Sequence, residues 1–350
     1  MTDQGTPLRP DEPHLLEVDG LEVKFFTQRG TVQAVRGVSF HIDRGETLGL
    51  VGESGSGKSV TSQAVLGLVE LPGRIVAGDI RWKGRSLIGR ANEKYSRSIR
   101  GKELAVIFQD PMTSLNPLFT IGTQLTEVLR HHLHMNRGQA RERAVELLDM
   151  VDISFPRQRV KQYPHEFSGG MRQRVIIAMA LACEPELIIA DEPTTALDVT
   201  IQAQILELLA DIQARLGLAV LLITHDLGVV AGLCHRVQVM YAGRLVESAE
   251  SHDLFVEPGH PYTRGLLRST PRLDQVQRRL VAIEGSPPDL RHPPSGCPFH
   301  PRCELAIDRC HEEMPPTVEF GGRTAACFRA FEQPPPTDPD DAAVPVETHG

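Results

Sequence analysis

Residues 52–59 read Gly52-Glu53-Ser54-Gly55-Ser56-Gly57-Lys58-Ser59. This spacing fits the phosphate-loop pattern, in which glycines let successive backbone N–H groups point onto a phosphate at a helix N-terminus. A short apolar run, residues 47–51, precedes the loop and predicts a buried strand that feeds a helix near Ser59. The strand argues against the alternative of a plain glycine turn. The candidate phosphate-binding residues are Gly52, Ser54, Gly55, Ser56, Gly57, Lys58 and Ser59. In this pattern the lysine reaches the β- and γ-phosphates and the serine holds Mg²⁺.

Apolar and alternating runs predict strands that alternate with helices. The expected strands cover residues 14–24, 32–42, 47–51, 186–191 and 218–224, and an expected helix covers residues 201–216. Residues 116–150 carry helical periodicity and predict a helical insertion. Strands that alternate with helices imply a parallel sheet covered on both faces.

Two carboxylates, Asp191 and Glu192, end one of the expected strands. An aspartate in this position can hold Mg²⁺, directly or through water, and the adjacent carboxylate can polarise an attacking water. The alternative is an ordinary acidic turn after a strand. The phosphate loop upstream favours the catalytic interpretation.

The composition is that of an ordinary globular protein. The 350 residues are 41% hydrophobic and 23% charged, and the net charge of -8 argues against a general nucleic-acid binder. The basic segment 81–102 has only Trp82 and Tyr95 as interleaved aromatics, so we interpret it as the solvated face of a small antiparallel subdomain. The polar, proline-containing residues 1–13 predict a flexible start rather than a signal peptide, and no apolar run approaches membrane-spanning length. We therefore expect a cytoplasmic chain whose membrane role comes through partners.

Six short motifs occur in an order that resembles the ATP-binding-cassette (ABC) ATPases over about residues 14–265. They are the phosphate loop, Gln109 after the run 105–108, Ser168-Gly169-Gly170, Asp191-Glu192, Ala196-Leu197-Asp198 and Thr224-His225-Asp226. The resemblance implies an α/β P-loop NTPase fold. It would be an ABC-type nucleotide-binding domain with an antiparallel β subdomain, a helical subdomain at about residues 111–180 and an irregular C-terminal extension.

The resemblance also implies catalytic roles. Glu192, His225 and Gln109 would be the catalytic residues: Glu192 activates the water, His225 hydrogen-bonds the γ-phosphate, and Gln109 reports the nucleotide state to a membrane partner. Ser59, Gln109 and Asp191 would be the Mg²⁺ ligands. Taken alone, Gln109 and His225 would instead be a surface glutamine and a structural histidine after a strand.

Two further groups of residues would contact ATP. Ser168, Gly169 and Gly170 would clamp the γ-phosphate bound by an opposite subunit, and Asp198 would lie across the dimer seam. Phe25, with Phe26 as the other candidate, would stack on adenine. A capped turn and an edge aromatic are the respective alternatives.

The signature departs from the commonest family form. Phe167 stands where that form has leucine and Met171 where it has glutamine, which looks like the variants found in peptide-importer ATPases. Residues 260–267 and 296–303 also resemble the C-terminal extension of oligopeptide and dipeptide importer ATPases. We therefore expect a C-terminal extension at residues 266–332 and a disordered, proline-rich tail at residues 333–350.

Four cysteines gather in the extension, whereas Cys183 and Cys234 lie in apolar surroundings. The four are Cys297, Cys303, Cys310 and Cys327. Four thiolates can hold a [4Fe–4S] cluster, which some members of that importer group carry, or tetrahedral Zn²⁺. The unpaired spacing argues against zinc, so we rank iron–sulfur first, four free or structurally buried thiols second and zinc third.

The resemblance implies the ATP-hydrolysing subunit of a bacterial-type importer for oligopeptides or dipeptides, using ATP and Mg²⁺. Its expected partners are a second ABC ATPase subunit, either a paralogue or a second copy of this chain, in a head-to-tail dimer, two integral-membrane permeases and an extracytoplasmic substrate-binding protein, with no nucleic acid. The expected location is the cytoplasmic face of the inner membrane, as a peripheral protein. Two alternatives are a soluble ABC-type ATPase outside transport and a non-hydrolysing sensor module.

Overall fold

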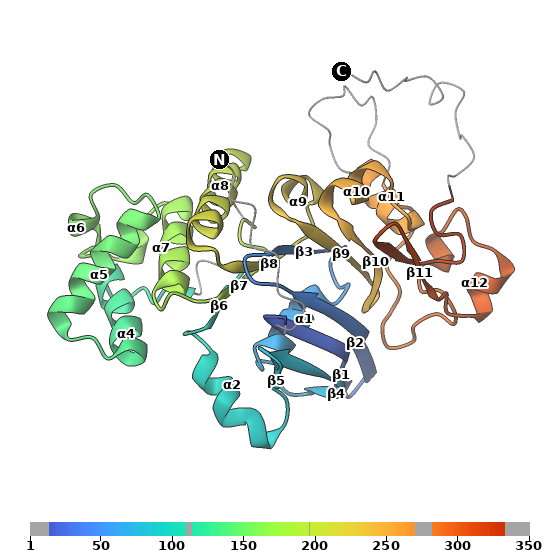
Figure 1. Cartoon of the computed structure of the whole chain (residues 1–350), viewed down its shortest axis with the longest axis horizontal. Coiled ribbons are helices and arrows are strands. Elements are labelled where there is room, and N and C mark those ends of the chain that lie inside the picture. Colours follow the sequence, from blue (N-terminus) through green and yellow to red (C-terminus); the bar gives the residue numbers. More distant parts are fainter. Residues whose placement is uncertain (1–13, 110–113, 196, 270–281, 333–350) are drawn as a thin grey trace, which may run out of the picture.

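The structure is a computed structural model that describes residues 14–109, 114–195, 197–269 and 282–332 (Figure 1). The expectations for residues 1–13, for Ala196 and for the tail at residues 333–350 lie outside this described part.

A predominantly parallel sheet forms the centre of the molecule. Among the described residues, eight strands follow the order β11-β12-β10-β9-β3-β8-β7-β6. The strands from β9 to β6 pair in parallel, and β10, β12 and β11 continue the sheet in antiparallel pairing. Their bounds are β3 (Thr47–Val51), β6 (Leu104–Ile107), β7 (Leu187–Asp191), β8 (Ala219–Thr224), β9 (Arg236–Tyr241), β10 (Arg244–Glu250), β11 (Thr317–Phe320) and β12 (Arg323–Ala326).

A second, antiparallel sheet lies beside the first. Its order is β2-β1-β4-β5, with bounds β1 (Leu16–Thr27), β2 (Gly30–Ile42), β4 (Gly73–Trp82) and β5 (Arg85–Ser86). The start of the basic segment 81–102 lies in β4 and β5. This part of the segment therefore belongs to an antiparallel subdomain, as expected.

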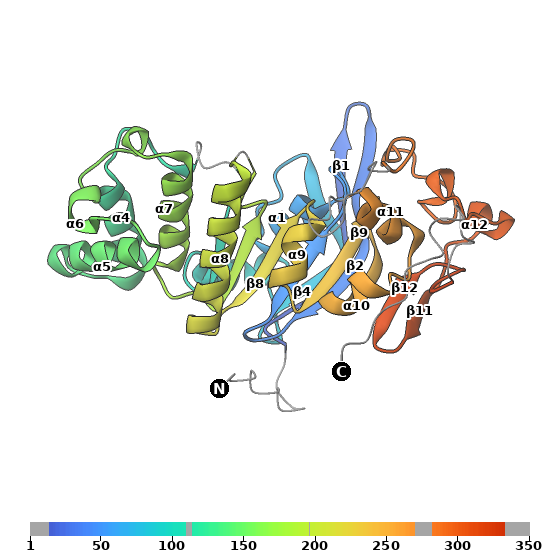
Figure 2. The same ribbon diagram turned by 90° about the horizontal axis from the view of Figure 1, so that it is seen from above.

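Helices flank both sheets. They are α1 (Lys58–Val65), α2 (Glu93–Ile99), α4 (Ile121–Leu133), α5 (Arg137–Met150), α6 (Pro156–Arg159), α7 (Gly169–Leu181), α8 (Val199–Leu216), α9 (Leu227–Leu233), α10 (Ser251–Val256), α11 (Pro261–Ser269) and α12 (Asp308–Glu312). Short 3₁₀ turns cover Arg90–Asn92, Pro164–Glu166 and His300–Arg302. Figures 1 and 2 show α4 to α7 gathered at one end of the molecule and α12 with β11 and β12 at the other.

The central strands are the ones that the sequence predicts most directly. Every residue of β3, β7 and β8 is buried, because both faces of a parallel sheet are covered. Alternate residues of β8 serve different cores: Leu222 packs in one apolar cluster, and Leu221 and Ile223 pack in the other. The predicted fold class is confirmed.

The C-terminal extension is less irregular than its sequence indicates. It contributes β11 and β12 to the edge of the central sheet, where Ser248 of β10 pairs with Thr324 of β12. The difference arises because these strands are only four residues long and all four residues of β11 are exposed, so they carry little periodic signal.

Among the helices described here, none is both long enough and apolar enough to cross a membrane.

Candidate active site

The phosphate loop joins β3 to α1, and its backbone requires glycine at two positions. Gly52 has φ 153° and Gly57 has φ 110°. A Cβ atom would lie 2.1 Å from the carbonyl oxygen of Met240 at the first position and 2.4 Å from that of Ala34 at the second. The loop is therefore shaped as a close backbone cradle into which side chains cannot be added.

Lys58 lies buried at the start of α1 and turns back onto the loop. Its Nζ donates to the carbonyl oxygens of Gly52 at 2.7 Å and Glu53 at 3.0 Å. Burial lowers the pKa of Lys58, whereas the nearby carboxylates Glu192 and Asp191 act in the opposite direction. The ammonium group is thus held beside the cradle by neutral oxygens.

Asp191 ends β7 and faces α1. Its Oδ1 accepts a hydrogen bond from Ser59 Oγ at 3.1 Å, and its Oδ2 accepts one from Ser62 Oγ at 3.1 Å. Burial raises the pKa of Asp191 against the effect of these two hydrogen bonds. Sequence reasoning missed Ser62, because a serine inside a helix carries no motif signal.

Glu192 follows in a left-handed backbone conformation with φ 47°, and its carboxylate is the meeting point of three side chains. Gln109 Nε2 and Thr195 Oγ1 donate to Oε2 at 3.0 and 2.9 Å. His225 Nδ1 lies 3.4 Å from Oε1. The three residues predicted to be catalytic are thus brought together, and Thr195 joins them without having been predicted.

A single cavity of about 1030 Å³ collects most of the predicted nucleotide residues. They are Phe25, Ser54, Gly55, Gly57, Lys58, Ser59, Gln109, Glu192 and His225. Gly52, Ser56 and Asp191 are buried and do not line the cavity. Of the two aromatic candidates Phe25 lines it, whereas Phe26 does not and is 49% exposed.

The predicted signature residues lie apart from this cavity, at the starts of two neighbouring helices. Ser168 caps α7 by accepting from the Met171 N–H at 3.3 Å, and Asp198 caps α8 by accepting from the Ile201 N–H at 3.0 Å. A Cβ atom on Gly170 would come within 2.6 Å of Ile201 Cγ2. The structure thus pairs Ser168-Gly169-Gly170 with the start of α8 rather than with the chain's own phosphate loop.

Comparison with known proteins agrees with this geometry. Residues 35–195 match the ABC transporter family, and residues 246–310 match the family described as oligopeptide/dipeptide transporter, C-terminal region. The chain is 55% identical over 304 residues to the oligopeptide transport ATP-binding protein OppD of Bacillus subtilis (strain 168), covering 86% of this chain and 85% of that protein. It is 49% identical over 314 residues to the dipeptide transport ATP-binding protein DppD of Escherichia coli (strain K12), covering 89% and 96%.

The chain belongs to the ATP-binding proteins of ABC transporters. Its membership implies an ATPase that works with ATP and Mg²⁺. The two alternatives, an ATPase outside transport and a non-hydrolysing sensor, have no support from these relatives.

Solved ABC cassettes share the fold. The dimeric post-hydrolysis structure of the ATP-binding cassette MJ0796 bound to ADP and Pi is 26% identical, with a TM-score of 0.59 and coverage of 67% of this chain and 98% of that one. The cbiO1 protein from Clostridium perfringens, part of a cbiONQ transporter complex, is 27% identical with a TM-score of 0.59, covering 70% and 91%.

The prediction of a [4Fe–4S] cluster, or of Zn²⁺, at the four late cysteines is corrected. A metal site needs several ligand atoms close together. Among the described residues, none of these four Sγ atoms belongs to a group of three or more possible ligand atoms that all lie within 4.8 Å of one another. The matched families and relatives are described by ATP binding and transport, and none by a metal cluster. Burial raises the pKa of Cys297 and of Cys303 to about 11. Cys297, Cys310 and Cys327 are buried parts of the extension's packing.

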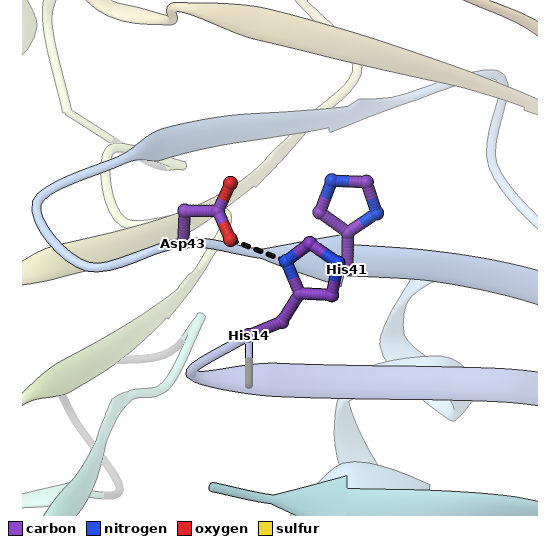
Figure 3. A group of neighbouring side chains, drawn as sticks. All are labelled: His14, His41 and Asp43. Atoms are coloured by element: carbon purple, nitrogen blue, oxygen red, sulfur yellow. Dashed lines mark hydrogen bonds and ion pairs between the residues drawn. The ribbon is translucent and has the colours of Figure 1, made fainter. Parts of the chain in front are cut away.

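Within the part of the chain that the structure describes, His14, His41 and Asp43 form the one group of possible ligand atoms that lie within 4.8 Å of one another, at the start of β1 and the end of β2 (Figure 3). His14 Nδ1 and Asp43 Oδ1 are hydrogen-bonded at 2.5 Å, and the His14 and His41 rings stack with centroids 3.9 Å apart. The hydrogen bond and the stacking account for the grouping, which fastens the start of β1 to the end of β2.

Proposed function

We propose that this chain hydrolyses ATP in the cavity between its phosphate loop and Glu192, and that it thereby drives the import of oligopeptides or dipeptides. The convergence of Lys58, Ser59, Gln109 and His225 on that cavity with Glu192 carries the proposal. The peptide substrate class is supported by the likeness to the named transport proteins and by the match at residues 246–310.

The loop suits a triphosphate because it leads into the N-terminus of α1, where backbone N–H groups can bind an anion. A phosphate oxygen would replace the carbonyl partners of Lys58. Ser59 and Asp191, joined by a hydrogen bond, are the hard oxygen donors that Mg²⁺ prefers, and Gln109 would add a third. When bound, Mg²⁺ would neutralise charge on the β- and γ-phosphates. Phe25 would stack on the adenine.

Hydrolysis would then depend on how Glu192 is held. Gln109 and Thr195 occupy one carboxylate oxygen, which leaves the other beside His225 for an attacking water. Glu192 would accept the proton of that water as it attacks the γ-phosphorus, and His225 would hydrogen-bond the γ-phosphate. Most of the catalysis would be positioning and charge stabilisation.

The signature residues Ser168, Gly169 and Gly170 would bind the ATP of a neighbouring subunit. Ser168, Gly169 and Gly170 lie outside the chain's own cavity at the N-terminus of α7, a helix of 13 residues, where N–H groups and the helix dipole favour an anion. In a head-to-tail dimer they would contact ATP bound by the other ATPase subunit, with Asp198 at the seam. The dimeric state of the solved MJ0796 cassette supports this arrangement.

The remaining parts of the proposal concern assembly. The ATPase pair would work with two integral-membrane permeases and an extracytoplasmic substrate-binding protein, at the cytoplasmic face of the inner membrane. Residues 14–265 would form the ATPase domain, with its helical insertion at about 111–180, and residues 266–332 the transporter-type extension.

Glu192→Gln tests the assignment of the base. The variant should bind ATP as wild type does and lose turnover by roughly 10²-fold or more, because the amide cannot accept the proton. Glu207→Gln on the exposed face of α8 is the matched control and should leave turnover unchanged. A Glu192→Gln chain with wild-type turnover would refute the assignment.

Import is tested separately in cells. A strain lacking this gene should lose uptake of a radiolabelled tripeptide, and the wild-type chain should restore it whereas the Glu192→Gln chain should not. Uptake that persists in the deletion strain, together with a purified chain that still hydrolyses ATP, would contradict the peptide substrate and leave the ATPase assignment standing.

A further inference from the structure

The C-terminal extension reaches back to the phosphate loop through one buried arginine. Arg302, at the end of the 3₁₀ turn His300–Arg302, has a side chain only 4% exposed. Its Nη1 and Nη2 donate to the two carboxylate oxygens of Glu53 at 2.6 and 3.0 Å. This is a two-pronged ion pair between the extension and the second residue of the phosphate loop, 249 positions away in sequence.

The other donors of the same guanidinium fix it in place. Nε donates to the Glu284 carbonyl oxygen at 2.9 Å, and Nη2 also donates to that of Ile283 at 3.2 Å. Nη1 lies 3.4 Å from the hydroxyl of Tyr241 in β9. Because the planar group is held on three sides, its orientation toward Glu53 is preset.

Tyr262 holds the backbone of the same loop residue. Its hydroxyl, carried by α11, accepts a hydrogen bond from the Glu53 N–H at 2.9 Å. The ring of Tyr262 is fully buried and packs against both Tyr241 and Phe299, with centroids 4.5 and 5.3 Å away. Both the side chain and the backbone N–H of Glu53 are therefore held by Arg302 and Tyr262, two residues that lie between β10 and β11 in the sequence.

The extension also lines the cavity itself. Ile283, Pro287 and Leu290 line the same cavity as Phe25 and Lys58. The Leu290 carbonyl oxygen accepts a hydrogen bond from the Gln33 N–H of β2 at 3.0 Å. The extension is thereby joined to the antiparallel sheet next to the cavity and to the phosphate loop.

We propose that the C-terminal extension is a built part of the nucleotide site and that Arg302 is a positioning residue, which holds the phosphate loop and neutralises Glu53 so that a triphosphate can bind. The inference rests on the nucleotide site proposed above. An unpaired carboxylate at Glu53 would repel the phosphates and release the loop, so the affinity for ATP depends on the docked extension. The chemistry of hydrolysis at Glu192 needs no contact with Arg302.

The test is a double-mutant cycle on the full-length chain, read by binding of a fluorescent ATP analogue with Mg²⁺ and by ATPase kinetics. Arg302→Gln should weaken nucleotide binding and raise KM by about tenfold or more, with a smaller effect on kcat, because it strands the Glu53 charge. Glu53→Gln combined with Arg302→Gln should recover much of the affinity, because no charge remains to be neutralised. A merely structural role for Arg302 would give no such recovery.

Arg309→Gln is the matched control, since Arg309 pairs with Glu313 inside the extension and makes no contact with the loop. It should bind nucleotide as wild type does. Arg302→Gln with wild-type affinity, or a double variant as weak as the single one, would overturn the inference. A wild-type chain that fails to bind ATP would instead overturn the proposed function.

Two milder variants keep the test decisive if Arg302→Gln does not fold. Arg302→Lys keeps the charge and loses the two-pronged geometry, and Tyr262→Phe removes only the hydroxyl that accepts from Glu53. Each should weaken nucleotide binding several-fold in a chain that still folds. Wild-type affinity in both folded variants would overturn the inference.

Discussion

Asp191 and Glu192 are adjacent residues with opposite surroundings. Asp191 is 8% exposed and holds two serine hydroxyls of α1. Glu192 is turned by its left-handed backbone onto the cavity, where Gln109 and His225 meet it. The sequence predicts a catalytic role for the two carboxylates, because they follow a buried strand and a phosphate loop lies upstream. It does not predict this division of environments, which depends on the φ of one residue and on hydroxyls from a distant helix.

Asp191→Asn should stabilise the fold and reduce activity. Burial raises the pKa of Asp191 above its ordinary 3.8, so the ionised carboxylate is disfavoured in the folded state. This cost to folding is present in full above the folded-state pKa and disappears as the pH falls below the unfolded value. At pH 8 the melting temperature should rise by about 2 °C or more, and the gain should shrink in acid.

The ATPase rate of Asp191→Asn should fall strongly, because a neutral amide is a poorer Mg²⁺ ligand. The control is Asp211→Asn, at an exposed ion pair with Arg215 on α8, which should change neither property. An Asp191→Asn protein less stable than wild type at pH 8 would contradict the burial argument.

At the scale of elements, the starts of α7 and α8 are fitted to each other. Ser168 and Asp198 cap the two helices, and Gly170 leaves just enough room for Ile201. The sequence predicts a helix over residues 201–216, which in the structure begins two residues earlier, at Val199, after the standard N-cap Asp198. It does not show that the second glycine of the signature is needed for packing between the helices, since a helical glycine has no steric signature in one sequence.

Gly170→Ala should destabilise the chain by about 1–3 kcal/mol, because its Cβ would lie 2.6 Å from the branched Ile201 side chain. Gly169→Ala is the matched control: its Cβ would lie 3.4 Å from Leu197 Cδ2, an ordinary contact. Urea unfolding measures the difference. Ile201→Ala added to Gly170→Ala should restore part of the loss, and equal destabilisation by the two alanines would refute this packing argument.

At the scale of the whole molecule, the proposed ATP site is split between two subunits. Lys58 and Glu192 line the cavity, whereas Ser168 does not line it and lies at the start of α7. The sequence implies this division only through its resemblance to the ABC ATPases. It does not predict that the extension pairs with β10 or that Arg302 meets Glu53, because neither contact leaves a local pattern.

Mixing two inactive chains tests the split site. Lys58→Ala and Ser168→Ala should each abolish turnover, because every homodimer then lacks the same half of both sites. An equal mixture should recover about a quarter of the wild-type rate, since half of the dimers are mixed and each mixed dimer has one intact site. The ATPase rate after mixing is the measurement, and no recovery would contradict head-to-tail pairing between copies of this chain.

The position of β12 also has a consequence for synthesis on the ribosome. β12 (Arg323–Ala326) is the last described strand to be translated, and until it emerges β10 pairs only with β9. A nascent chain that stops before Arg323 presents an open strand edge, which is a template for aggregation with other chains. The ATPase therefore cannot complete its central sheet until Ala326 has been made, and a chain that stops before Arg323 should yield insoluble protein rather than a shortened enzyme.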